Sequence, residues 1–213
     1  MKRKLTAALL AIVVAFAFMP AAAFASSKAK MTVCTDAVKC GNTVYCATAG
    51  FGICKVTVKN GKVKSKKWLD KSDWCYGPFS YISDMKKKGN YLYYIQGSEG
   101  TVSYLYRMNV KTGKKKQLCK NVEKDAIKGK KIYAKVWKEN NYGDMTYFKR
   151  SMKLNGASKK KTSVKAVMRI VVSNAKGYSV VYKEKNGYVK SYLKTPKGKF
   201  YLGKSEDPVA SYD

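Results

Sequence analysis

The chain has 213 residues, of which 44 are Lys or Arg and 13 are Asp or Glu, so its formal net charge is +31. It contains no histidine, which excludes Ser-His-Asp and Cys-His catalysis, imidazole base chemistry and zinc sites with histidine ligands. Hydrophobic residues make up 46% of the chain and aromatic residues 13%, which is too apolar for a disordered polycation. The composition therefore predicts a folded, strongly basic protein.

The N-terminus has the pattern of a secretory signal peptide. A basic start, Met-Lys-Arg-Lys, precedes an apolar run over 5–19, and residues 21–25 read Ala-Ala-Ala-Phe-Ala. The run is shorter than the ~20 apolar residues that span a bilayer, and the small residues suit a cleavage site. We expect cleavage after Ala25 to leave one domain over 26–213, with 41 basic and 13 acidic residues and a net charge of +28. This predicts a secreted or envelope-associated protein with no further membrane span; an uncleaved anchor is the alternative.

Six cysteines lie in the first half of the mature chain, and all are disulfide candidates: Cys34, Cys40, Cys46, Cys54, Cys75 and Cys119. An even number in an exported protein favours disulfides, although small buried thiols are an alternative. The spacings contain no C-x-x-C pair, so we expect no metal site, and we expect no cofactor. The sequence leaves the pairing open.

Four segments share one repeated pattern. Each opens with a glycine turn and a short aromatic or β-branched strand, at Gly41, Gly89, Gly129 and Gly177, which are 48, 40 and 48 residues apart. Second strands are predicted over 53–58, 104–110, 147–154 and 188–193, each followed by a glycine-containing turn and a basic third strand. The period is near the ~40–50 residues of a four-stranded propeller blade. With no amphipathic helix in the mature chain, the pattern predicts an all-β array of about four blade repeats.

The second repeat is the most regular. It reads Gly-Asn-Tyr-Leu-Tyr-Tyr-Ile from Gly89 and Leu-Tyr-Arg-Met-Asn-Val-Lys-Thr-Gly-Lys-Lys-Lys-Gln-Leu over 105–118. It resembles the repeats of the domain of unknown function 5050 group of bacterial exported proteins, which is related to TolB-like propellers. The resemblance implies a propeller-like fold and brings no catalytic motif. The repeats are expected to form either a closed small propeller or an open partial one, with a strand near 31–34 available to complete the last blade.

Paired carboxylates are the first candidates for catalysis, because glycoside hydrolysis requires two of them about 5–10 Å apart. The pairs close in sequence are Asp70 with Asp73, Glu139 with Asp144, and Glu206 with Asp207. All lie in polar, turn-like stretches that are typical of solvated loops, so we predict no catalytic residues and no enzyme. A carbohydrate-active enzyme that uses Asp or Glu is the alternative.

Runs of lysine recur near the turns and outer strands of the repeats. The runs that we expect to bind a ligand are Lys86, Lys87 and Lys88, and Lys114, Lys115 and Lys116. They favour a surface that attracts polyanions such as teichoic acid or acidic polysaccharide. The alternative is that lysine on outer strands prevents edge-to-edge aggregation. The mature chain has three Arg against 38 Lys, which argues against sequence-specific reading of nucleic acid.

The densest aromatic cluster surrounds residue 75. Of its members, Trp68, Trp74 and Tyr76 are candidates for stacking on sugar rings; the alternative is that they fill the core between blades. The whole pattern predicts an exported, non-catalytic binding or envelope-associated module with affinity for polyanions. A structural accessory subunit of a surface complex is a further alternative. The sequence leaves the oligomeric state open.

Overall fold

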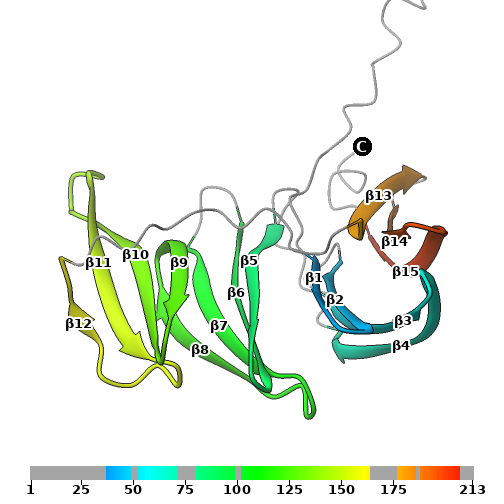
Figure 1. The fold of residues 1–213 in the computed structure, drawn as a ribbon. Helices are drawn as coiled ribbons and strands as arrows, with labels where there is room; N and C mark the ends of the chain where they lie inside the picture. Colours follow the sequence, from blue (N-terminus) through cyan, green and yellow to red (C-terminus); the bar gives the residue numbers. More distant parts are fainter. Residues whose placement is uncertain are drawn as a thin grey trace, which may run out of the picture. The chain divides into compact units, whose positions relative to one another are not determined.

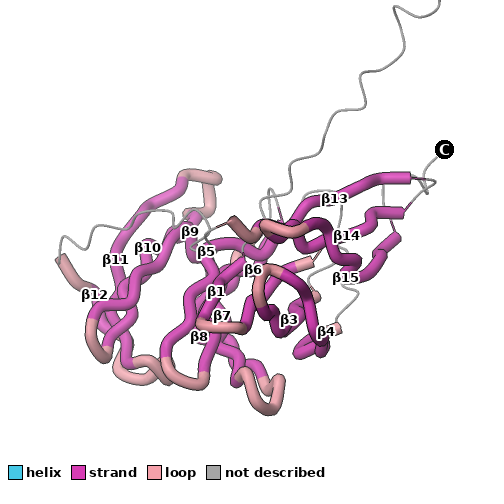
Figure 2. Tube along the Cα trace, turned by 45° about the vertical axis from the view of Figure 1, so that its right-hand side comes forward, coloured by secondary structure: helices cyan, strands magenta, loops and turns pink. Residues whose placement is uncertain are grey.

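A computed structural model of the chain describes residues 37–206, apart from gaps at 49–51, 72–79, 99–101, 164–176 and 186–187. The described residues form strands joined by turns, and none of them is helical (Figure 2). Accordingly, the described residues include no helix long and apolar enough to cross a membrane. The predicted signal peptide over 1–25 and the predicted strand near 31–34 lie outside the described residues. The all-β prediction is confirmed for the part of the chain that the structure describes.

The strands form four antiparallel sheets, which follow one another along the chain (Figure 1). The first sheet contains β1 (Ala37–Cys40), β2 (Thr43–Ala47), β3 (Ile53–Lys59) and β4 (Lys62–Asp70). The second contains β5 (Ser80–Lys88), β6 (Tyr91–Ser98), β7 (Tyr104–Asn109) and β8 (Lys115–Lys120). The third contains β9 (Val122–Lys128), β10 (Lys131–Glu139), β11 (Met145–Lys153) and β12 (Lys160–Lys161). The fourth contains β13 (Ser179–Lys185), β14 (Tyr188–Thr195) and β15 (Gly198–Glu206).

The predicted repeats correspond to these sheets, in which every strand pairs with the next one in sequence. The predicted first strands are β2, β6, β10 and β13. The structure adds a strand before each of the first three, namely β1, β5 and β9, which the sequence pattern did not predict. Gly41, Gly89 and Gly129 form the tight turn after that added strand, with φ of 57°, 56° and 59°. Glycine adopts such positive φ values without steric cost, which explains why the repeat keeps it there.

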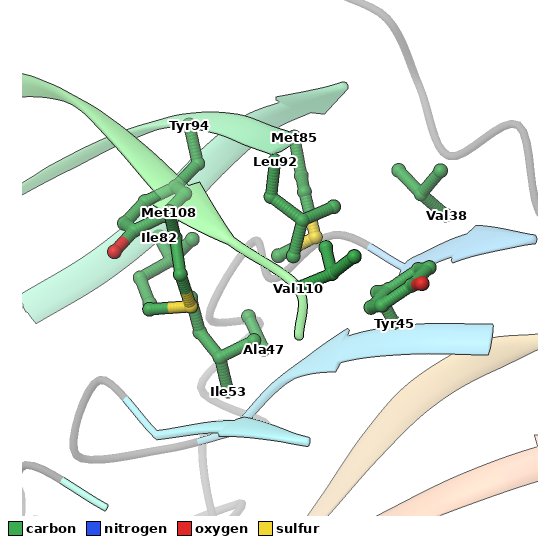
Figure 3. Close-up of a cluster of buried hydrophobic side chains, with 10 residues drawn as sticks. All are labelled: Val38, Tyr45, Ala47, Ile53, Ile82, Met85, Leu92, Tyr94, Met108 and Val110. Carbon is green, nitrogen blue, oxygen red and sulfur yellow. The ribbon is translucent and has the colours of Figure 1, made fainter. Parts of the chain in front are cut away.

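Three buried clusters join neighbouring sheets. The first lies between the first and second sheets, where Tyr45 and Ile53 pack with Leu92, Tyr94 and Met108 (Figure 3). The second cluster joins the first sheet to the fourth, and the third joins the second sheet to the third. The sheets therefore pack in the order fourth, first, second, third. This is an array of repeated sheets, and it is consistent with a propeller-like arrangement.

The two middle sheets of this order are covered on both faces, whereas the two end sheets are not. In β2, Val44 and Cys46 pack toward the fourth sheet, while Tyr45 and Ala47 pack toward the second. The third and fourth sheets each contribute to one cluster of the described residues only. In the described part of the chain, each end sheet thus has one face without a packed neighbour.

Candidate functional site: a lysine face on the third sheet

The uncovered side of the third sheet is built from alternate residues of its strands. On β10, Ile132, Ala134 and Val136 are buried against the second sheet, so the residues between them point to the other side. Directly opposed residues of neighbouring strands share a face, and the register extends this side onto β9, β11 and β12. We call the following side chains the lysine face: Lys124, Lys128, Lys131, Lys135, Lys149, Lys153 and Lys160, with Tyr133, Trp137, Met145 and Tyr147. The exposed Glu139, opposite Met145, lies at the far end of the same side.

Six of the seven lysines of this face form two rows across three strands. In the outer row, Lys131 of β10 lies directly opposite Lys128 of β9 and Lys153 of β11. In the inner row, Lys135 lies opposite Lys124 and Lys149. Opposed side chains have Cβ atoms ~4.5–5.5 Å apart, and four residues along a strand separate the rows by ~13 Å. In each of the two rows, positively charged side chains are therefore held next to one another on the same surface.

The inner row has a local counter-charge and the outer row does not. Glu123 is the extra residue where the pairing of β9 with β10 shifts register, and its carboxylate lies 2.5 Å from Lys135 Nζ and 3.6 Å from Lys124 Nζ. Among the ion pairs of the described residues, none involves Lys128, Lys131 or Lys153, and all three are exposed. The outer row therefore presents three uncompensated positive charges to solvent.

Aromatic side chains lie beside the inner row. Tyr147 is opposite Trp137, and the ring centroid of Tyr147 is 4.3 Å from Lys135 Nζ. Tyr147 is 49% exposed and the neighbouring Met145 is 58% exposed. An exposed ring next to ammonium groups can contact the apolar face of a sugar while the lysines bind its acidic substituents.

The predicted aromatic ligand site is only partly within the described residues, because Trp74 and Tyr76 lie outside them. Trp68 is half-buried and packs against the cluster between the first and fourth sheets. Its ring lies so close to Gly203 that a Cβ there would come within 2.9 Å of it. Lys66 Nζ lies 5.4 Å from the centroid of the same ring. These contacts correspond to the alternative in which the aromatic residue fills the core between two sheets.

The six predicted ligand-binding lysines lie on β5 and near β8, the two edge strands of the second sheet. Lys86 is bound within a buried ion cluster, and Lys115 Nζ lies 2.8 Å from Asp70 Oδ2. Lys87 Nζ donates a hydrogen bond to the carbonyl of Gly89. The exposed members are Lys88, Lys114, Lys115 and Lys116. Edge positions agree with the aggregation-preventing alternative, so the structure favours the lysine face as the candidate site over these runs.

A pair of carboxylates that the sequence reasoning missed lies between the second and third sheets. Asp125 is fully buried and Asp84 is 5% exposed. Lys86 Nζ lies 2.6 Å from Asp84 Oδ1 and 2.9 Å from Asp125 Oδ1, and the Asp125 backbone N–H donates to Asp84 Oδ2. Burial, outweighing the attraction of Lys86, raises the pKa of Asp125 to about 7. No signal in sequence pointed to them, since 41 residues separate the two.

The carboxylate pairs that are close in sequence do not form acid–base sites where they are described. Asp70 is ion-paired to Lys115, and Asp144 accepts a hydrogen bond from the Asn140 side chain within a turn. Asp73 and Asp207 lie outside the described residues, and so does the side chain of Glu206. In the described part of the chain, no group of three or more Cys, Asp or Glu side chains is placed to hold a metal ion.

The described cysteines Cys40, Cys46, Cys54 and Cys119 are free thiols, whereas Cys34 and Cys75 lie outside the described residues. Cys46 and Cys54 lie opposite each other on β2 and β3, and both are fully buried. Burial raises the pKa of the Cys54 thiol to about 12 and that of Cys46 still further. These thiols are therefore unreactive side chains of the core in the folded state.

A comparison with protein-family models and with curated proteins finds no match. Among solved structures, the computationally designed Ika4 protein is similar with a TM-score of 0.38 and 10% identity, covering 81% of this chain and 93% of that one. A Saccharomyces cerevisiae Dbp5 complex with Nup159, Gle1, IP6 and ADP is similar with a TM-score of 0.39 and 12% identity, covering 78% of this chain and 46% of that one. At these values the similarities identify neither a family nor a function.

Proposed function

We propose that the protein is an exported, non-catalytic module that binds anionic polymers of the cell envelope through the lysine face. The observation that carries the proposal is the register of the third sheet, which sets Lys131 directly between Lys128 and Lys153. Opposed like charges destabilise a sheet by roughly 0.2–1 kcal/mol per pair. A polyanion that lies across the row neutralises this repulsion. The row of lysines therefore destabilises the free protein and stabilises its complex with the polyanion.

Protection of sheet edges does not account for the central lysines of this face. Lysine protects a sheet when it lies on an edge strand, whereas β10 is paired on both sides, with β9 and with β11. Lys131 and Lys135 are therefore internal to the sheet. Solubility alone is satisfied by lysines at any exposed position and does not need them to be opposed in register.

We also propose that the repeats form an open, propeller-like array related to the TolB-like repeats. Closing a ring would cover the lysine face with another sheet. Burying ammonium groups without counter-charges costs several kcal/mol for each, which a sheet-to-sheet contact does not recover. The charge of the face thus favours an array whose third sheet stays open to ligands.

The absence of catalysis is part of the same proposal. Asp84 and Asp125, whose carboxylates face each other, are buried and ion-paired to Lys86. A glycosidase needs such a pair beside a substrate rather than inside the core. This cluster supports a structural role.

Binding to heparin, polyphosphate and neutral dextran tests the proposal. We expect heparin to bind with an affinity that falls as salt rises, and dextran not to bind. Replacing Lys128, Lys131 and Lys153 by Gln should weaken binding about a hundredfold, at about 1 kcal/mol per lysine near an anionic surface. Tighter binding of heparin than of polyphosphate would identify acidic polysaccharide as the ligand class, and the reverse order would identify a phosphate polymer such as teichoic acid.

The matched control replaces Lys64, Lys111 and Lys120 by Gln. These exposed lysines lie on β4, in the turn between β7 and β8, and on β8. This variant loses the same charge from scattered positions, so its affinity should change much less. Equal losses in the two variants would show that only net charge matters and would overturn the assignment of the site.

A further inference from the structure

The fourth sheet carries a second face of the same kind. On β14, Leu193 is fully buried and Ser191 is buried, both toward the first sheet, so Lys190, Tyr192 and Lys194 point to the other side. The register extends that side to the neighbouring strands. We call the following side chains the second lysine face: Lys183, Lys190, Lys194, Lys199 and Lys204, with Tyr188, Tyr192 and Tyr201.

The second face repeats the geometry of the first. Lys190 of β14 lies directly opposite Lys183 of β13 and Lys204 of β15, which is again a row of three lysines centred on an internal strand. Lys194 lies opposite Lys199. Glu206 and Lys185 lie opposite Tyr188 in the register, and their side chains are outside the described residues. None of the five lysines named above belongs to an ion pair of the described residues.

Aromatic rings accompany these lysines as well. Tyr192 lies opposite Tyr201, with ring centroids 5.6 Å apart, and Lys204 Nζ lies 4.3 Å from the Tyr188 centroid. Tyr201 is 45% exposed and Tyr188 is 37% exposed. The two faces thus offer the same combination of opposed ammonium groups and accessible rings.

We propose that the two lysine faces are two separate sites for the same anionic polymer, so that one molecule bridges two polymer chains. This inference rests on the proposed function and adds to it the number of binding sites, which is two per molecule. The order of packing places the first and second sheets between the third and the fourth. Each site is therefore built on its own sheet, with its own supporting core, and neither needs residues of the other.

Bridging follows from the chemistry of two equivalent sites. A protein with one basic face coats a polyanion, whereas a protein with two faces links polymer chains or holds one long chain at two points. In the second case the local concentration of the polymer near the free face raises the overall affinity without any new contact. Cross-linking of a polyanionic matrix is the resulting property.

The experiment compares three variants in the full chain. The first replaces Lys128, Lys131 and Lys153 by Gln, the second replaces Lys183, Lys190 and Lys204 by Gln, and the third combines them. Calorimetric titration with short heparin fragments measures the number of sites, and aggregation of heparin-coated beads measures bridging. The triple substitution of Lys64, Lys111 and Lys120 by Gln is the charge control.

We expect the wild type and the control to bind two fragments and to aggregate the beads. Each single-face variant should bind one fragment and leave the beads dispersed, and the combined variant should bind none. Thermal unfolding of every variant checks folding. The conservative triple variant Lys183→Arg, Lys190→Arg and Lys204→Arg should retain binding at the second face.

Two results would overturn the inference while leaving the proposed function intact. In one, the variant of the second face still binds two fragments and aggregates the beads. In the other, each single-face variant loses all binding, which would mean one composite site. Failure of the wild type to bind heparin at all would instead reject the proposed function itself.

Discussion

At the residue scale, the ion cluster of Asp84, Lys86 and Asp125 ties the second sheet to the third. Asp84 and Lys86 come from β5, at an irregularity in its pairing with β6, and Asp84 has a φ of 56°. Asp125 comes from β9 and is fully buried. A buried ion pair contributes little net stability when intact, but the loss of one partner costs roughly 3–5 kcal/mol. The cluster therefore fixes how the two sheets meet.

The raised pKa of Asp125 predicts a specific pH dependence. Its native pKa is about 7 against an ordinary value of 3.8, so between these pH values the folded carboxyl holds a proton that the unfolded one has released. The contribution of this group to stability is present below pH ~4 and is lost as pH rises to about 7. The free energy of unfolding of the wild type relative to Asp125→Asn should therefore fall across this window.

Urea unfolding of both proteins between pH 4 and pH 8 measures this difference. Asp144→Asn, at an exposed turn, is the control, and its difference from the wild type should not fall in the same way. A difference between wild type and Asp125→Asn that is constant with pH would contradict the assignment of the proton to this cluster.

Trp68 is a residue whose role, ligand contact or core packing, the sequence alone does not decide. Its aromatic neighbours in the chain suggested either a ligand platform or a core filler. The choice depends on Gly203, which leaves room for the ring and is 135 residues away. The sequence does not reveal such a contact because nothing local specifies it.

At the element scale, β6 and β10 illustrate two kinds of strand. β6 begins Tyr-Leu-Tyr-Tyr-Ile, is apolar on both faces and lies in a sheet covered on both sides. β10 reads Lys-Ile-Tyr-Ala-Lys-Val-Trp-Lys-Glu, with alternate residues buried. Continuous apolar runs are typical of strands buried on both faces, and alternation is typical of strands with one open face. The alternation in β10 is therefore a signal from which an open face could have been inferred, but the sequence-based prediction of a site did not use it, and the sequence alone does not show which lysines are opposed.

The opposed lysines predict that Lys131→Gln stabilises the protein. The substitution removes repulsion with both Lys128 and Lys153, so the free energy of unfolding should rise by about 0.5–1 kcal/mol at low salt. The gain should shrink at high salt, where surface charges are screened. Urea unfolding in ~10 mM and ~500 mM NaCl measures both values.

Lys64→Gln is the control for this effect. Lys64 is exposed on β4 at a position where the pairing with β3 skips a residue, so it has no directly opposed lysine. Its substitution should change stability by only a few tenths of a kcal/mol. A loss of stability in Lys131→Gln would show that the row is not under repulsion.

At the scale of the whole molecule, the packing order determines where the chain is most protected. Among the described residues, the first and second sheets have cores on both faces, and the third and fourth sheets have a core on one face. Local opening is easiest where fewer apolar contacts must be broken. The ends of the array should therefore be its least stable parts.

Hydrogen exchange measures this gradient directly. Amides of β2 and β6 should exchange more slowly than those of β10 and β14. All four strands are internal to their sheets, each paired on both sides. The comparison is matched because backbone hydrogen bonding is equivalent. Equal protection of β6 and β10 would indicate that another sheet covers the lysine face and would contradict an open array.

The sequence by itself determined the strand class, the repeat period and the strong positive charge, because these depend on local alternation, on turn glycines and on composition. It missed β1, β5 and β9, the last of which has polar residues that follow no alternation. It also located the lysine runs without locating a site. The tertiary structure decided which lysines stand opposite each other and which face is uncovered. Both depend on pairing register and on sheet packing order, which arise from contacts between residues distant in the chain.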